Sequence, residues 1–282
     1  MKIENLIWSG CSFSAGSAFT PRPQWSKAEE NDEFLFAHKD LKKYFTLPYT
    51  NKNVKKQIHD LTFPIKLGKK LGIKNTKNLA VGGMGYPIHI RRIMSYLLNN
   101  NLDYGKTVVC LQLTSFQRNE VIKVHSARWP ENPSGSIEFC WLDGAQGEDH
   151  TKHHLINYYD ATYSVMKALY ELLFFKGWCE SKNIKCHFIG FHGFIENQIM
   201  IYLKKYDTYK KQINNHQLCH GDYDFPEVDN LLKELEITEL PKILNATFTC
   251  QGYHNDSHYS PDGHDKISNI LVDIFKNKFG YE

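Results

Sequence analysis

Hydrophobic residues along the chain of 282 residues fall either in short continuous runs or at helical spacing. The short runs predict buried strands at 6–9, 77–81, 107–113, 184–191 and 245–250. Helical spacing predicts helices over 54–71, 87–98, 155–181, 226–235 and 261–275. Because strands alternate with helices, the pattern predicts an α/β protein with three layers, in which helices cover both faces of a central parallel sheet of about five strands.

Two stretches lack a sustained period, at about 20–53 and at 119–154. Both are rich in turn residues, so we interpret them as loop insertions in a single domain that spans 1–282. Residues 195–225 are ambiguous, with a helical start followed by a loop. Long loops at the carboxyl edge of a parallel sheet usually shape a pocket, and the two insertions are therefore expected to border the site.

Charge and cysteine content narrow the class of protein. The 34 basic and 31 acidic residues give a net charge of +3, which does not favour a nucleic-acid partner. Neither a signal peptide nor a run of roughly 20 apolar residues for a membrane span is recognisable. The cysteines number seven, without a C-x-x-C pair, which is typical of reduced thiols. We therefore expect a cytoplasmic protein; the sequence predicts no oligomeric state.

The first apolar run ends in a turn that carries a candidate nucleophile. Gly10 stops the run, and Cys11 and Ser12 follow at the expected start of a helix. Such a turn holds a hydroxyl group at the carboxyl edge of the sheet, near the amides that open the helix. Ordinary strand-to-helix turns also contain small hydroxylated residues, so Ser12 needs partners elsewhere in the chain.

A second stretch, Asn255–His264, supplies those partners. Asp256 precedes His258 by two residues, just before the helix that Pro261 opens. In an extended loop this spacing lets the carboxylate orient the imidazole of a general base. An acid near a histidine is also common in surface loops. Together with Ser12, however, the pair predicts a nucleophile, a base and an orienting acid at one edge of the sheet.

Four short blocks, in chain order, resemble the signature blocks of the SGNH (GDSL) hydrolases. The first block resembles G-D-S-L and places Ser12 at the nucleophile. The last resembles H-x-[TS]-P-x-G-H and places His258 at the base, with His264 in the following helix. The blocks are Gly10–Phe13, Asn78–Gly83, Thr114-Ser115 and His258–His264.

The resemblance implies a flavodoxin-like fold, a Ser12–His258–Asp256 triad and no cofactor or metal. It implies an oxyanion site built by the amides of Ser12 and Gly83, with the Ser115 hydroxyl group as a third donor. The reaction would be hydrolysis of an O-acyl ester of a small molecule or glycan. We favour an acetyl ester on a carbohydrate, because aromatic and histidine side chains in the insertions could stack on sugar rings; these are Trp25, Trp129, Trp141, His153 and His154.

The chain departs from the family pattern at three places. Cys11 stands where the first block usually has aspartate, and Ser115 stands where the third usually has asparagine. The acid usually precedes the histidine by three residues, a position held here by Asn255. The weak third block predicts a slow enzyme, or a donor recruited from Gln117 or Arg118. Both are also candidate substrate-binding residues, since Arg118 could hold an anionic group, although a surface ion pair is an equal alternative.

Several alternatives follow from the same residues. Cys11 at a helix start could be the nucleophile as a thiolate. Cys250, His254, His258 and His264 have ligand types that suit zinc. The changes at Cys11 and Ser115 also fit a weak or inactive domain that binds a glycan or a protein. An O-acyltransferase would use the same triad as a hydrolase.

Overall fold

The computed structural model describes ten segments of the chain. They are residues 2–15, 59–81, 85–114, 116, 119–123, 138–142, 161–203, 228–243, 259 and 261–281. Within these, the side chains of 12, 13, 119–123, 138–142 and 161 are outside the description. All structural statements below concern the described residues.

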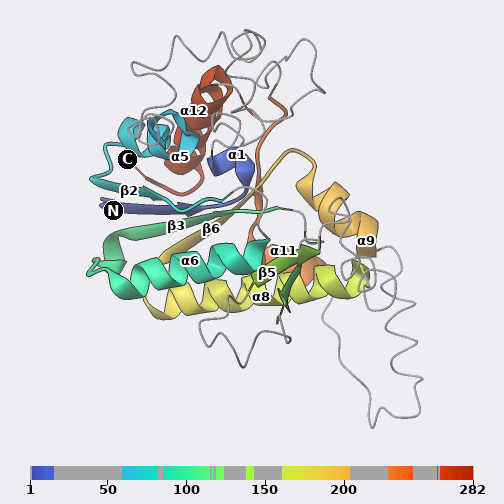
Figure 1. Ribbon diagram of the computed structural model, residues 1–282. Helices are drawn as coiled ribbons and strands as arrows, with labels where there is room; N and C mark the ends of the chain where they lie inside the picture. Colours follow the sequence, from blue (N-terminus) through green and yellow to red (C-terminus); the bar gives the residue numbers. More distant parts are fainter. Residues whose placement is uncertain are drawn as a thin grey trace, which may run out of the picture.

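A sheet of five parallel strands forms the centre of the molecule (Figure 1). In spatial order the strands are β2 (Asn75–Asn78), β1 (Asn5–Ser9), β3 (Thr107–Gln112), β6 (Lys185–Gly190) and β7 (Thr238–Glu239). From β1 the chain moves outward to β2 and then returns to the other side of β1 to form β3. The order therefore reverses between β1 and β3, and the carboxyl ends of these two strands border the crevice where open α/β sheets bind ligands.

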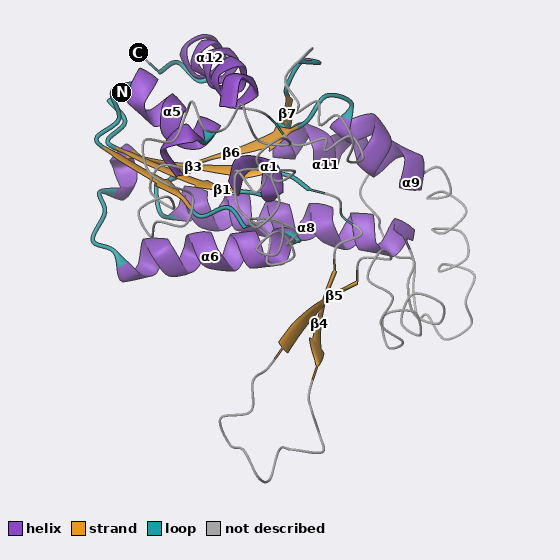
Figure 2. Cartoon of the chain, turned by 45° about the horizontal axis from the view of Figure 1, so that its top comes forward, coloured by secondary structure: helices purple, strands orange, loops and turns teal. Residues whose placement is uncertain are grey.

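Helices cover both faces of the sheet (Figure 1). One face carries α5 (Phe63–Lys70) and α12 (Pro261–Asn277), and the other carries α6 (Tyr86–Asn99), α8 (Ala161–Ser181) and α11 (Val228–Leu235). The predicted three-layer α/β/α fold with a five-stranded parallel sheet is therefore confirmed. The two chain ends lie side by side at the amino edge of the sheet (Figures 1 and 2).

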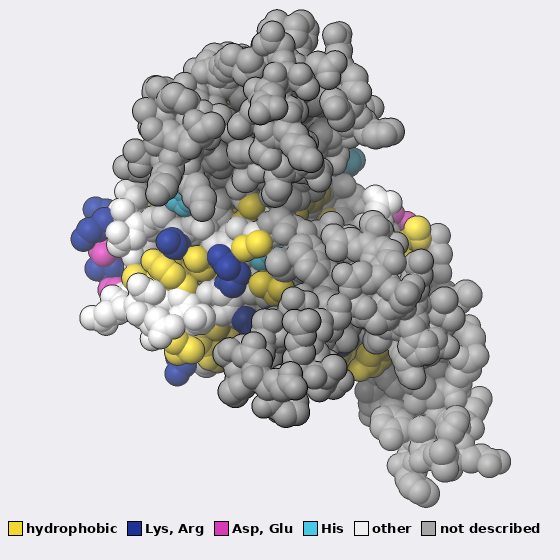
Figure 3. Space-filling model, viewed as in Figure 1, with side chains coloured by type: hydrophobic (Ala, Val, Ile, Leu, Met, Phe, Trp, Pro, Cys, Tyr) yellow, Lys and Arg dark blue, Asp and Glu magenta, His cyan; other side chains and the backbone are white. Residues whose placement is uncertain are grey.

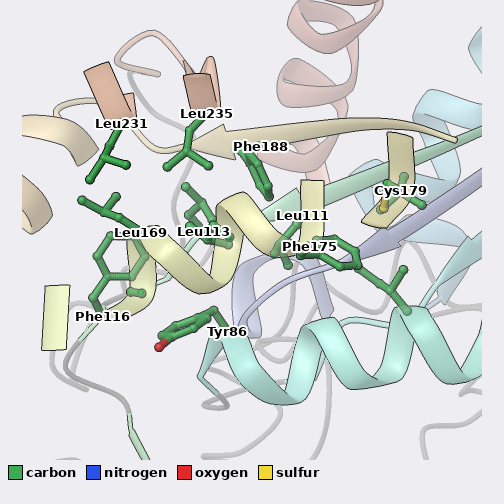
Figure 4. Close-up of a cluster of buried hydrophobic side chains, with 14 of the residues drawn as sticks. Tyr86, Leu111, Leu113, Phe116, Leu169, Phe175, Cys179, Phe188, Leu231 and Leu235 are labelled. Atoms are coloured by element: carbon green, nitrogen blue, oxygen red, sulfur yellow. The ribbon is translucent and has the colours of Figure 1, made fainter. Parts of the chain in front are cut away.

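Each face of the sheet has its own hydrophobic core, because successive side chains of a strand point to opposite faces. Ile7 and Val109 belong to the core under α6, α8 and α11, part of which is drawn in Figure 4. Leu6, Trp8 and Val108 belong to the core under α5 and α12. Every residue of β1 and β3 is buried, which explains why both strands read as continuous runs.

The edge strands differ most from the prediction. β2 is Asn75–Asn78, two residues earlier than the predicted start at 77, because an edge strand with alternately exposed side chains carries no apolar run. β7 was not predicted, since it has only two residues. The strand predicted at 245–250 lies outside the described residues.

Part of the second insertion forms a ribbon of two antiparallel strands, β4 (Asn119–Lys123) and β5 (Glu138–Leu142). Figure 2 shows this ribbon apart from the five-stranded sheet. The sequence analysis predicted no strand for these ten residues. Strands of five residues are too short to give a strong periodic signal.

The remaining elements are short. They are α1 (Ser12–Ala15), the 3-10 turn η3 (Tyr104–Lys106), the π-helical turn η5 (Ile195–Met200) and α9 (Ile201–Leu203). The predicted helix at 54–71 is confirmed for α5, and its residues 54–58 lie outside the description. Among the helices described, none combines the length and hydrophobicity needed to cross a bilayer.

Candidate active site

The turn between β1 and α1 lies at the reversal point of the sheet. Gly10 follows the buried strand β1, and α1 begins at Ser12. The amide of Ala15 donates to the carbonyl of Cys11 over 3.0 Å, which closes the first helical turn. The backbone of Ser12 is therefore placed at the carboxyl edge of β1, as the sequence predicts.

Gly10 is required here by a close approach of neighbouring side chains. A Cβ atom at this position would lie 2.6 Å from Cβ of Gln112 and 2.9 Å from Oγ of Ser14. Real Cβ atoms do not approach other heavy atoms this closely, so only glycine fits without a shift. The turn that leads to Ser12 is thus packed directly against the end of β3.

Three buried polar groups form a hydrogen-bonded chain under this turn. Trp8 Nε1 donates to Ser14 Oγ over 3.0 Å, and Ser14 Oγ in turn donates to Gln112 Oε1. An indole N–H can only donate, so the Ser14 hydroxyl group has its own hydrogen left for Gln112. Trp8 and Ser14 have no exposed surface, and Gln112 is 1% exposed. The chain fixes α1 to both β1 and β3.

The end of β2 is bonded to the same turn. Asn78 Nδ2 donates to the carbonyl of Ser14 over 2.8 Å, while Asn78 Oδ1 accepts from the amide of Ala80. Val81 continues the pairing past the strand, because its amide donates to the Gly10 carbonyl over 3.0 Å. The first two sequence blocks therefore lie next to each other. Gly83, the predicted oxyanion glycine, lies outside the described residues.

The start of α12 packs on the other side of the turn. Phe63 donates its amide to His264 Nδ1 over 3.0 Å, and its ring stacks on the His264 ring with centroids 5.4 Å apart. The Phe63 ring also meets the edge of Trp8 at 5.3 Å. His264 is 1% exposed and lies in α12 as predicted. His264 therefore has a structural role, in which it packs the start of α12 against α5.

Tyr259 brings the last sequence block next to the first. Its ring lies 6.0 Å from that of His264 and 5.9 Å from that of Phe191, measured between centroids. Burial raises the pKa of the Tyr259 hydroxyl group, and the nearby Cys11 thiol raises this pKa further, because a thiolate would oppose a phenolate. The residue after His258 is thus a neighbour of the residue before Ser12.

Most predicted site residues lie outside the described part of the chain. Of the triad, the structure describes only the backbone of Ser12. The residues outside are Gly83, Ser115, Gln117, Arg118, Asp256 and His258. The triad and its oxyanion donors therefore stay predictions.

The alternatives meet the structure in part. Cys11 is 3% exposed and buried against Tyr259, and a buried thiol is a poor candidate nucleophile. Among the described residues, no three His, Cys, Asp or Glu side chains could share a metal ion. Of the four zinc candidates only His264 is described, and its Nδ1 accepts the Phe63 amide.

A serine–histidine contact lies on the opposite face of the sheet from Trp8 and Ser14. Ser9 Oγ is 3.1 Å from His89 Nδ1 and 3.4 Å from the carbonyl oxygen of Leu79. Both side chains are fully buried and bonded to protein partners, which makes Ser9 a poor candidate nucleophile. We interpret this pair as a link between β1 and α6.

A shallow cavity of about 490 Å³ lies on the outer face of α6, next to Leu79 at the end of β2. Figure 3 shows Lys and Arg side chains beside hydrophobic ones on this side of the molecule. The polar side chains that line the cavity are Arg91, Arg92, Ser95, Tyr96, Asn99 and Asn100. Such donors and acceptors suit a polar ligand.

Sequence reasoning missed Gln112 and Ser14. A signal for Gln112 existed, because a polar residue ends an otherwise apolar strand at the reversal point of the sheet. Ser14 carried no signal of its own, since small hydroxylated residues are common in such turns.

No protein-family model matches the sequence, and the search of curated proteins likewise gives no match. Similar solved structures include an acetyl xylan esterase from the rumen bacterium Butyrivibrio proteoclasticus, with 11% identity, a TM-score of 0.46, and coverage of 100% of this chain and 65% of that one. A carbohydrate esterase whose active site is described as having divergent catalytic and non-catalytic binding functions has 12% identity, a TM-score of 0.43, and coverage of 100% and 70%. A G-D-S-L family lipolytic protein from Veillonella parvula has 9% identity, a TM-score of 0.40, and coverage of 97% and 98%.

The chain thus spans just under two thirds of the length of the acetyl xylan esterase. Likenesses this loose assign neither a residue nor a substrate.

Proposed function

We propose that the protein is a serine ester hydrolase that uses Ser12, His258 and Asp256. One observation carries the proposal: Tyr259, next to His258 in the chain, lies near Cys11, next to Ser12. The parts of the chain proposed to hold the nucleophile and the base are separated by nearly the whole sequence, and the packing of α12 on the face of β1 and α5 brings them together. Their meeting at the reversal point of the sheet is what a Ser-His-Asp site needs.

The reaction would follow the acyl-enzyme route. His258 takes the proton of Ser12 as its oxygen attacks the ester carbonyl carbon, and then gives this proton to the leaving alcohol. A water molecule, deprotonated by His258, releases the acid and restores Ser12. Asp256 stabilises the imidazolium, and the amides of Ser12 and Gly83 with the Ser115 hydroxyl group would face the oxyanion.

The substrate that we propose is an O-acyl ester on a carbohydrate, with acetyl as the favoured acyl group. Aromatic and histidine side chains in the two insertions, such as Trp25, Trp129 and His153, could stack on sugar rings and support this choice. Gln117 and Arg118 remain candidate binding residues on the insertion side. A series of nitrophenyl esters of rising chain length tests the acyl size, with acetate expected to be the best substrate.

Labelling of the folded protein by a fluorophosphonate probe tests the nucleophile. We expect one probe per chain, and a loss of roughly 10⁴- to 10⁶-fold in turnover of nitrophenyl acetate for Ser12→Ala and His258→Ala. Ser9→Ala is the matched control, because Ser9 is buried on the other face and should label like the parent. An unlabelled parent, or a Ser12→Ala variant that labels equally well, contradicts the assignment.

A glycan-binding domain with little or no activity is the second candidate. The buried Cys11, at the position where the family has aspartate, favours it, because this thiol packs near Tyr259 instead of facing solvent. Undiminished glycan binding by a Ser12→Ala/His258→Ala variant, with no ester turnover by the parent, would favour this function. Transfer of the acyl group to an added sugar would instead indicate an O-acyltransferase.

A further inference from the structure

The end of β3 holds a buried donor that the described residues leave unpaired. Gln112 is 1% exposed, and none of the described groups accepts a hydrogen bond from its Nε2. A buried N–H without a partner costs about 1–3 kcal/mol, so such a group in a native structure needs an explanation. Gln112 therefore calls for an acceptor that comes from outside the described residues.

The orientation of this amide is determined by its neighbours. Ser14 receives the N–H of Trp8 and must donate its own hydrogen to an acceptor, which is the Oε1 atom of Gln112. The carboxamide cannot flip without placing an N–H donor against the Ser14 hydrogen. Its NH₂ group is thus held away from Ser14, as a fixed donor in a site shielded from bulk water.

The location of Gln112 favours an acceptor that belongs to the substrate. Its Cβ atom is packed against Gly10, two residues before Ser12, and β3 is one of the two strands that border the ligand crevice. The third sequence block, only two to three residues further on, lacks the asparagine carboxamide of the related family. Gln112 carries the same chemical group at the same end of the same strand.

We infer that the Gln112 side-chain amide donates a hydrogen bond to the acyl oxygen of the ester as this oxygen becomes negative in the transition state. The inference rests on the proposed function and assigns the side-chain donor to Gln112 in place of Ser115. A fixed donor in a dry site stabilises an oxyanion more than a neutral carbonyl oxygen, so the effect falls mainly on kcat. It also gives the Gln112 N–H an acceptor, which none of the described groups supplies.

Two variants at Gln112 test the inference. Gln112→Glu keeps an acceptor for Ser14 and removes the amide donor, and Gln112→Met removes both polar atoms at similar volume. We expect kcat for nitrophenyl acetate and the rate of fluorophosphonate labelling to fall about 10²- to 10³-fold in both, with KM nearly unchanged. Ser9→Ala should retain both rates, and thermal unfolding of each variant reports its folded fraction.

Each outcome decides one question. If Gln112→Met is folded and keeps the parental kcat, the amide serves only a trapped water, and the inference is wrong although the hydrolase stands. The inference is also wrong if the rate falls only in proportion to the unfolded fraction of the variant. If Gln112→Met does not fold, kcat of Gln112→Glu shows whether loss of the amide donor slows the reaction. A parent that neither labels nor turns over ester overturns the proposed function and this inference with it.

Discussion

Two buried hydrogen-bonded groups lie at the end of β1, on opposite faces of the sheet. On the face of α6, Ser9 contacts His89, and both side chains are engaged with protein partners. On the face of α12, the bonds run from Trp8 through Ser14 to Gln112 and end at an N–H that no described group accepts. We call the Ser9–His89 group closed, because its side chains are bonded to protein partners. We call the Trp8–Ser14–Gln112 group open, because its last N–H has no acceptor among the described residues.

The comparison shows why a serine beside a histidine does not by itself mark a catalytic site. Ser9 and His89 have the right chemistry, yet they are sealed in the core, and a closed group contributes only to folding. The open group lies on the face where Tyr259 and Cys11 meet, next to the proposed nucleophile. A donor left unpaired in that place is useful only when a ligand arrives.

The largest effect on the free energy of unfolding is expected at a third buried group, which surrounds His187. Its Nε2 lies 3.1 Å from the Tyr281 hydroxyl group, and its ring stacks on Phe279 with centroids 3.6 Å apart. Burial, with help from Lys185 and other lysines nearby, lowers the pKa of His187 to about 4. The folded state therefore holds the imidazole neutral, and protonation favours unfolding.

Because the pKa is lower in the folded state, the stability from this group is complete above about pH 6.5 and is lost as the pH falls toward 4. We expect the parent to lose about 3 kcal/mol more unfolding free energy between pH 7.5 and 4 than His187→Gln loses. Urea denaturation at the two pH values measures the difference. Equal losses would show that His187 is already accessible to protons when folded.

The next largest effect is expected for Gly10→Ala, which adds a Cβ atom where the turn after β1 packs against the end of β3. Gly10→Ala places a Cβ atom 2.6 Å from Cβ of Gln112, so β1 or β3 must shift, at a cost of about 2–3 kcal/mol. The same shift moves Ser14 and Gln112, so we also expect kcat to fall, by more than 10-fold and up to about 10²-fold, because a small misplacement of site residues slows catalysis by about that much. Thermal unfolding and ester turnover measure the two effects.

Gly177→Ala is the matched control for Gly10→Ala. Gly177 lies inside α8, and a Cβ atom there would meet nothing within 4 Å. Alanine in a helix is more stable than glycine by about 0.5–1 kcal/mol, so this variant should gain stability and keep its activity. A Gly10→Ala variant as active as Gly177→Ala would show that the tight contact at the turn has no functional role.

The buried elements of the molecule are also the elements that the sequence predicts best. β1, β3 and α6 were found because burial on both faces, or a helical apolar stripe opened by Pro87, leaves a strong pattern. β7 and the β4–β5 ribbon were missed because short or exposed strands leave none. Gln112 was missed because a single polar residue inside the predicted strand 107–113 was interpreted as part of that strand.

For the site, the sequence predicts that the two ends of the chain meet, and the neighbourhood of Tyr259 and Cys11 agrees with that prediction. The distance between the hydroxyl group of Ser12 and the imidazole of His258 stays a prediction, since their side chains lie outside the description. Local patterns cannot supply such a distance, because it depends on how two separate loops pack against each other.

The smallest effects compare the two serines directly. Ser9→Ala and Ser14→Ala each remove a buried hydroxyl group and leave a partner without its bond, so each should cost about 1–2 kcal/mol of unfolding free energy. Their effects on catalysis should differ. Ser9→Ala leaves kcat unchanged, whereas Ser14→Ala frees the Gln112 amide to rotate and lowers kcat about 3- to 10-fold, as expected for roughly 1 kcal/mol of lost preorganisation. Denaturation curves and nitrophenyl acetate kinetics measured on both variants test this. If the two substitutions change kcat equally, the open and closed groups do not differ in function, and the proposed contact between Gln112 and the substrate is wrong.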